Sequence, residues 1–98
     1  MKIKRQSNIE NILDKIPTPC YVLEEKLFKQ NLKLLKYVKE QSGAKILLAL
    51  KGYSFYESFD MAREYLDGCC CSGLYEARLA NEEFKKEVHT YSPAFKDD

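Results

Sequence analysis

The chain has 98 residues, of which 45% are hydrophobic and 32% charged, and its 16 basic and 15 acidic residues leave a net charge of +1. This length and composition are typical of a single small globular unit, which buries only about 60 to 65% of the surface of its unfolded chain. The interleaved, nearly neutral charge disfavours nucleic acid and membrane partners, because both attract proteins with a concentrated basic surface.

No segment of the sequence predicts export or a membrane span. The basic start, MKIKRQ, is not followed by a signal-like apolar run, and Glu10 and Asp14 argue against an organellar presequence. No run approaches the roughly 20 apolar residues that cross a bilayer. The cysteines, Cys20 and the consecutive residues 69–71, match neither a disulfide framework nor a C-x2-C zinc clamp. We therefore expect a cytoplasmic protein with reduced thiols and no metal site.

The first part of the chain predicts a short helix, a brief strand and a long helix. Ser7 begins a capping box of the form S-x-x-E, and apolar residues follow it at helical spacing as far as Pro17. Residues 20–23, CYVL, predict a strand. The next segment has an apolar stripe of helical period that ends at Gly43, a natural residue to follow a helix. The residues of that stripe are Phe28, Leu32, Leu35 and Val38.

The rest of the chain predicts three further strands separated by two helices. Residues 44–50 are apolar on both alternating faces apart from Lys45, the pattern of a parallel strand covered on both sides. A second capping box begins the next helix at Ser54, and a strand follows at 69–71. Ser72 or Gly73 opens a third helix, and a last strand covers 87–91. The two helices carry the stripes Phe55, Phe59, Ala62, Leu66 and Leu74, Ala77, Ala80, Phe84.

The resulting order, βαβαβαβ with short connections, predicts an α/β fold with an all-parallel sheet. A complete (β/α)8 barrel needs about 250 residues. We therefore expect residues 1–98 to be the N-terminal part of a larger TIM-like barrel, incomplete in this chain. A small open α/β sandwich is the alternative.

Lys51 is the residue in this pattern that is most suited to chemistry. It lies one residue beyond an apolar strand, at the carboxyl end, where the active sites of such folds gather. Gly52 beside it lets a flat ligand approach closely. A free lysine with a pKa of about 10.4 needs desolvation or capture by a carbonyl, as in a Schiff base with pyridoxal phosphate, to act as a nucleophile. On position alone, a lysine that merely extends into water is the commoner case.

Several motifs resemble the opening of the fold type III pyridoxal-phosphate decarboxylases, which include ornithine, arginine and diaminopimelate decarboxylases. Within that group, ALKG and especially HTYSP are similar to the carboxynorspermidine (carboxyspermidine) decarboxylases of bacterial polyamine synthesis. The likeness covers nearly the whole chain, and HTYSP is its most specific part. The motifs are TPCYVLE (18–24), LALKG (48–52), CSGLYEARLA (71–80) and HTYSP (89–93).

The resemblance implies roles for Lys51 and Glu76. Lys51 would hold pyridoxal 5'-phosphate as a Schiff base and, once the substrate displaces it, reprotonate the intermediate after carbon dioxide leaves. Glu76 would pair with the released ammonium, although an exposed first-turn glutamate is an equally good interpretation. Tyr91 and Ser92 lie at the carboxyl end of the last predicted strand, a position from which they would face the cofactor pocket, and the sequence assigns them no further role. The implied substrate is a small carboxylated polyamine, and the implied full-length enzyme is a homodimer.

The sequence also departs from the family. Where ornithine decarboxylase has an aspartate on the strand before the third helix, the nearest match here is Cys70. We interpret the three consecutive cysteines as small side chains that pack on both faces of the sheet, and His89 as an ordinary strand residue. The family's phosphate-binding glycine loop, the glutamate for the pyridine nitrogen and the C-terminal β-domain are expected beyond Asp98. The chain alone should therefore be inactive.

Three alternatives remain open at this point. The chain could derive from another fold type III decarboxylase, such as diaminopimelate or ornithine decarboxylase. It could belong to a single-domain pyridoxal-phosphate-binding protein that serves cofactor homeostasis. It could also be a small α/β scaffold in which Lys51 is inert.

Overall fold

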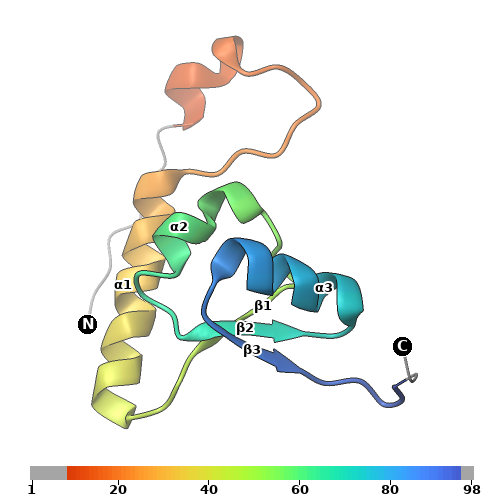
Figure 1. Cartoon of the computed structure of the whole chain (residues 1–98). Helices are drawn as coiled ribbons and strands as arrows, with labels where there is room; N and C mark the ends of the chain where they lie inside the picture. Colours follow the sequence, from red (N-terminus) through yellow and green to blue (C-terminus); the bar gives the residue numbers. More distant parts are fainter. Residues whose placement is uncertain (1–8, 96–98) are drawn as a thin grey trace.

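The computed structural model describes residues 9–95, which form a three-stranded sheet with helices packed on one face (Figure 1). The described part begins with a 3-10 helix, η1 (Ile9–Lys15), and continues through the long helix α1 (Glu25–Ser42) into the sheet. The other elements, in order, are β1 (Leu47–Ala49), the 3-10 helix η2 (Tyr56–Ser58), α2 (Phe59–Ala62), β2 (Gly68–Cys71), α3 (Leu74–Leu79), the π-helical turn η3 (Ala80–Phe84) and β3 (Glu87–Thr90).

The three strands are parallel and lie in the order β1-β2-β3, which confirms the predicted parallel α/β arrangement. Helical segments connect them, because parallel neighbours cannot be joined by a tight hairpin. Where β2 and β3 begin, the backbones come unusually close. A Cβ atom added to Gly68 would lie 2.0 Å from the carbonyl oxygen of Glu87. Only glycine fits at that position without moving a strand.

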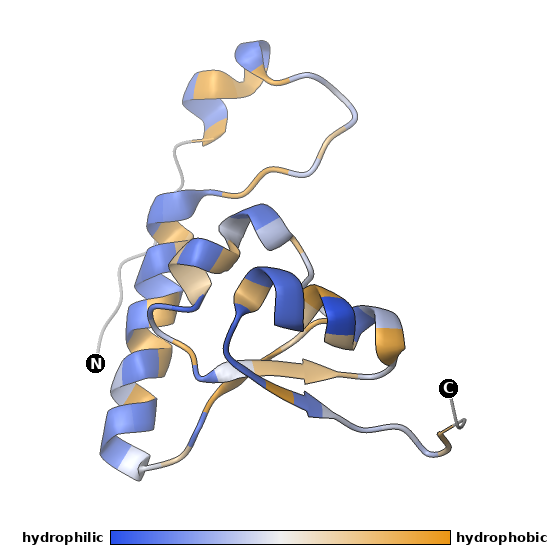
Figure 2. Ribbon diagram, viewed as in Figure 1, coloured by the Kyte–Doolittle hydropathy of each residue, from blue (hydrophilic) through white to orange (hydrophobic). Residues whose placement is uncertain are grey.

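The hydrophobic core lies on one side of the sheet. Cys69 and Cys71 of β2 are buried toward the helices, whereas Cys70 between them is exposed. In Figure 2, β2 carries the colour of apolar residues, and β3 is largely polar. The buried residues of the core are Leu32, Leu50, Phe59, Ala62, Leu66, Cys69, Cys71, Ala80 and Phe84.

The opposite face of the sheet is open within residues 9–95. The register pairs Ala49 with Cys70 and Cys70 with His89, and all three side chains are exposed. This corrects the expectation that strand 44–50 is covered on both sides, and it also limits the packing of the cysteines to one face. The apolar sequence of residues 44–50 therefore predicts more burial than the described residues provide on this face.

The predicted end of α1 is confirmed, and a single carboxylate links this helix to the sheet. Gly43 has a φ of +75°, and its N–H donates to the carbonyl of Lys39 at 2.9 Å, a geometry that glycine adopts at little cost. The Lys39 ammonium also donates to Asp67 Oδ1 at 3.2 Å, and Asp67 Oδ2 accepts the Ile46 N–H at 2.8 Å. Asp67 thus joins α1, the entry to β1 and the turn before β2.

The strand predicted at residues 20–23 does not form in the described structure. The segment runs outside the sheet as an irregular connection (Figure 1), and the side chain of Tyr21 is fully exposed. A strand is stable only when a neighbour pairs with its backbone, and an apolar pattern does not provide that neighbour. The prediction of a strand there is wrong for this chain.

Two details of the predicted helices are also wrong. The capping box at Ser54 is not used: Phe55 occupies the cap of η2, and no side chain caps the helix. Four residues of the predicted apolar stripes are exposed rather than buried: Leu35 (38%) and Val38 (46%) of α1, and Phe55 (45%) and Leu74 (53%) at the beginnings of the later helices. The capping box expected at Ser7 lies outside the described residues. None of the helices within residues 9–95 is long and apolar enough to cross a membrane.

Candidate functional site at the carboxyl edge of the sheet

Lys51 lies in the turn directly after β1, at the carboxyl edge of the sheet, where the sequence predicts it. The N–H of Leu50 donates to Cys70 O at 3.1 Å, which brings Lys51 level with the end of β2. The N–H groups of Gly52 and Tyr53 both donate to Ala49 O, at 3.1 and 3.2 Å, and so close the turn around the lysine. The Lys51 side chain is exposed and makes no ion pair or hydrogen bond within residues 9–95.

The segments that follow β2 and β3 meet Lys51 at the same edge, because the three strands are parallel. Tyr91 continues the ladder beyond β3, since its N–H donates to Cys71 O at 3.0 Å, and its side chain is exposed. Ser92 is half-buried, and its Oγ donates to Ala94 O at 2.9 Å. The structure thus places Lys51, Tyr91 and Ser92 on one edge.

Glu76 lies in the first turn of α3 and points one oxygen into the loop after β2. Its Oε2 accepts the N–H of Ser72 at 3.2 Å, whereas its Oε1 is buried and has no hydrogen-bond partner in the described part of the chain. Burial, and next the charge of Glu76, raise the pKa of the Cys71 thiol. The carboxylate is therefore close to the end of β2. A buried oxygen without a partner is costly, so this position favours a cation or an N–H donor.

The cysteines of β2 and the histidine of β3 are divided between the core and the open face of the sheet. Burial raises the pKa of Cys69 to about 12, which makes it a core thiol rather than a nucleophile. Cys70 and His89 are neighbours on the open face. No group of three or more histidine, cysteine, aspartate or glutamate side chains in residues 9–95 could hold a metal ion.

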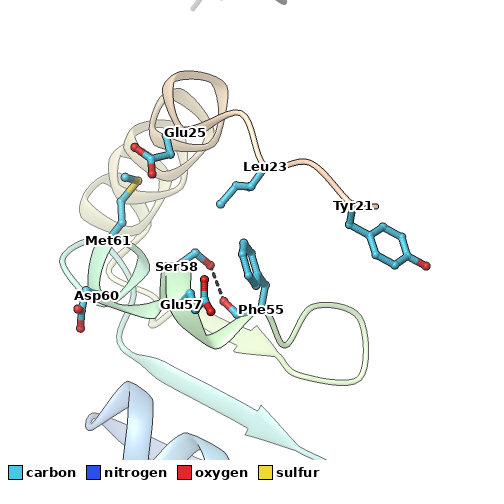
Figure 3. Close-up of a pocket in the computed structure, with 8 residues that line it drawn as sticks. All are labelled: Tyr21, Leu23, Glu25, Phe55, Glu57, Ser58, Asp60 and Met61. Carbon is cyan, nitrogen blue, oxygen red and sulfur yellow. Dashed lines mark hydrogen bonds between the residues drawn. The ribbon is translucent and has the colours of Figure 1, made fainter. Parts of the chain in front are cut away.

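Of the three hollows beside residues 21–25, two face the segment that follows β1, and one of these two borders the Lys51 turn. The larger, of about 670 Å³, separates Tyr21, Val22 and Leu23 from residues 52–55. The smaller, of about 400 Å³, lies between the same segment and η2 with α2. Figure 3 shows Leu23 and Phe55 facing each other across it, with acidic side chains around them. Lys51 itself lines neither hollow.

Two contacts that hold the turn after Lys51 are not predicted by the sequence analysis. The ring of Tyr53 stacks on Phe28 of α1, with centroids 5.6 Å apart and planes 23° from parallel. Its hydroxyl lies 2.6 Å from Ser58 Oγ. An aromatic residue two places after the lysine is a visible signal, but the sequence assigns it only to general packing.

Comparisons with known proteins confirm the resemblance to decarboxylases of polyamine synthesis. The chain is 56% identical over 85 residues to a carboxynorspermidine/carboxyspermidine decarboxylase of Campylobacter jejuni, and 43% identical over 82 residues to one of Herminiimonas arsenicoxydans. It is 44% identical over 86 residues to a carboxyaminopropylagmatine decarboxylase of Synechocystis. No family model matches the chain.

The structural comparison agrees with these relatives. The chain superposes with a TM-score of 0.82 and 57% identity on the crystal structure of carboxynorspermidine decarboxylase from Campylobacter jejuni in complex with norspermidine. That match covers 85% of this chain and 23% of the neighbour. Each of the three curated relatives is likewise covered over only 22% of its length, so the chain spans about a fifth of the proteins it matches.

Proposed function

We propose that this chain, a homologue of one segment of the carboxynorspermidine/carboxyspermidine decarboxylases, carries the reactive lysine of a pyridoxal-phosphate-dependent decarboxylase. The reaction would convert carboxynorspermidine or carboxyspermidine into norspermidine or spermidine. The position of Lys51 supports this conclusion most strongly: its amine is exposed and unpaired within residues 9–95, at the edge where three loops meet. Two relatives that are 56% and 43% identical bear the name of this activity.

The residues at this edge fit pyridoxal 5'-phosphate. Lys51 offers a primary amine, and Gly52 next to it leaves room, because the nearest atom to an added Cβ would be 3.7 Å away. Glu76 contributes a carboxylate oxygen that lacks a partner in the described residues. When bound, the cofactor supplies the ring system that accepts the electron pair left on the substrate as carbon dioxide departs.

Lys51 would have two tasks in this reaction. It would first bind the aldehyde carbon of the cofactor covalently. After the substrate amine takes its place, the freed Lys51 amine would return a proton to the carbon that has lost carbon dioxide. The charge of Glu76 would stabilise the ammonium form that Lys51 then needs. Tyr91 and Ser92 would form part of the wall that faces the cofactor, where the lone pairs of the Ser92 hydroxyl remain free to accept a hydrogen bond.

The proposal extends to the architecture of the whole protein. Residues 1–98 would be the N-terminal part of a (β/α)8 barrel, with the open face at Ala49, Cys70 and His89 turned to the barrel interior. The small coverage of each relative supports this assignment, since most of their length has no counterpart here. The four cysteines are free, as they remain in the reducing cytoplasm, and we place the enzyme there as a homodimer.

Covalent trapping tests the role of Lys51 directly. The chain is incubated with pyridoxal 5'-phosphate, whose aldehyde condenses with an amine as water leaves, and borohydride reduces the C=N bond to a stable C–N bond. Peptide mapping then locates the label. We expect it mainly on Lys51 and expect Lys51→Ala to remove it. Lys45→Ala, which removes an exposed lysine before the same strand, should leave it unchanged. Labels spread evenly over the exposed lysines would overturn the proposal.

The relative from Synechocystis suggests carboxyaminopropylagmatine as a second candidate substrate. Initial rates of carbon dioxide release with the two kinds of carboxylated amine would decide between them, in the longest protein that contains this segment. The 98-residue chain alone should release no carbon dioxide from either, because it corresponds to about a fifth of the active relatives.

A further inference from the structure

We infer that Tyr53 is a positioning residue for Lys51: its ring and its hydroxyl together fix the turn that carries the reactive amine. This inference depends on the proposed role of Lys51 and adds to it a residue that neither the motifs nor the names of the relatives assign. Tyr53 follows Lys51 by two residues, and its side chain is half-buried while its neighbours Gly52 and Ser54 are exposed.

The ring of Tyr53 attaches the turn to the longest helix. It stacks on Phe28 at a centroid distance of 5.6 Å, and Phe28 in turn packs against the hydrophobic core. Stacked aromatic pairs of this geometry are favourable beyond the apolar area they bury. The contact therefore joins the loop after β1 to α1, an element more than twenty residues earlier in the chain.

The hydroxyl of Tyr53 attaches the same turn to the beginning of the next helix. It lies 2.6 Å from Ser58 Oγ, and Ser58 is 92% buried, with 8% of its surface exposed. Ser58 Oγ also donates to Phe55 O at 2.7 Å. A serine hydroxyl has only one hydrogen, so Tyr53 must be the donor to Ser58. The result is a chain of hydrogen bonds from Tyr53 through Ser58 to the backbone of Phe55.

These contacts matter because little else restrains Lys51. Its backbone lies beyond the last paired residue of a short strand, its side chain has no partner within residues 9–95, and the glycine that follows is intrinsically flexible. The N–H of Tyr53 closes the turn on Ala49 O, so fixing Tyr53 at both ends of its side chain fixes the loop on which Lys51 lies. A catalytic amine reacts at a rate set by the fraction of time it spends in the productive position.

The experiment uses the trapping reaction and two variants that remove the same hydrogen bond. Tyr53→Phe keeps the ring stacked and loses the donor, and Ser58→Ala loses the acceptor. Each should lower the ratio of label on Lys51 to label on the other lysines by about threefold to tenfold, the range expected for one hydrogen bond. The double variant should be no worse than Ser58→Ala alone, because Ser58→Ala already removes the bond that Tyr53→Phe removes, in addition to the bond from Ser58 to Phe55 O. Tyr53→Leu, which also removes the ring, should lower the ratio further.

Tyr65→Phe is the matched control, because Tyr65 packs against the core and has no contact with the Lys51 turn among the interactions described. It should leave the ratio unchanged. If Tyr53 has only a structural role, its variants would lower the temperature of unfolding but keep the labelling ratio of the folded chain, and the inference would be overturned. If wild type itself shows no preference for Lys51, the proposed function fails instead. The two failures are therefore distinguishable.

Discussion

Replacing Gly68 with alanine should destabilise the protein strongly, because the new methyl group would collide with backbone. The added Cβ would lie 2.0 Å from Glu87 O, 2.7 Å from Glu87 C and 2.9 Å from Glu87 Cα. All three atoms belong to the main chain of β3 and cannot rotate away as a flexible side chain would. An ordinary contact begins at 3.4 Å, so the strands must separate by about 1.4 Å, the difference between 3.4 and 2.0 Å.

The free-energy cost follows from that displacement. Separating the starts of β2 and β3 breaks the bond from Glu87 N–H to Asp67 O, which is 3.3 Å long, and disturbs the next bond of the ladder. Each lost backbone hydrogen bond costs about 1 kcal/mol, and overpacking adds about 1 to 3 kcal/mol. The reduced freedom of the unfolded alanine chain offsets about 0.4 to 1 kcal/mol. The net loss should be about 3 kcal/mol.

Urea denaturation followed by circular dichroism measures this loss, with Gly73→Ala as the matched control. Gly73 has an extended backbone, and an added Cβ would meet no atom within 4 Å. Its replacement should change the free energy of unfolding by less than about 1 kcal/mol. If both variants unfold at the same urea concentration, β2 and β3 do not approach each other as closely as the structure shows.

Two further predictions concern titratable groups. The N–H of Ile46, and next Lys39, lower the pKa of Asp67 below its ordinary 3.8, so the ionised form stabilises the fold above that value and the contribution is lost as the pH falls through the lower folded-state pKa. Asp67→Asn should therefore be less stable than wild type at about pH 7, and the difference in urea midpoint should close toward about pH 2; a difference independent of pH would contradict this. Cys69, whose pKa burial raises to about 12, should resist iodoacetamide in the folded chain, whereas the adjacent exposed Cys70 should react. Equal alkylation of the two, measured by peptide mapping, would be incompatible with a sheet covered on one face.

The sequence predicts the elements of this fold whose causes are local. Gly43 ends α1 because its neighbours form a helix and only glycine readily takes a φ of +75°. The sequence also predicts strand β2, because the small apolar residues 69–71 directly follow Asp67 and Gly68, which end the preceding helix. Residues 20–23 carry an equally good strand pattern but have no strand partner within residues 9–95, because a strand depends on a neighbour that can be distant in the chain. The sequence shows the pattern of such a segment but not whether a partner is present.

Some residues of the candidate site could likewise be placed from the sequence, and some of its contacts could not. Lys51 and Glu76 could be located from the sequence, because each lies at a fixed offset from the end of a strand or the start of a helix. The hydrogen bond between Tyr53 and Ser58 could not be predicted from the sequence, because a separation of five residues matches neither helical nor strand periodicity. It arises from the path of the loop, which depends on the stack with Phe28, a contact between distant segments.

The open face of the sheet also bears on how well Lys51 can react. Formation of a C=N bond between an amine and an aldehyde releases water, so bulk water at the site favours the reverse reaction. Ala49, Cys70 and His89 beside the Lys51 edge are exposed in residues 9–95, so water reaches the amine freely. Covering this face would exclude water and strengthen every charge interaction at the edge, including that of the Glu76 oxygen for which residues 9–95 offer no partner. If Lys51 binds pyridoxal 5'-phosphate as proposed, a longer protein that covers the face should retain it at concentrations far below those that label this chain, with the same lysine as the point of attachment.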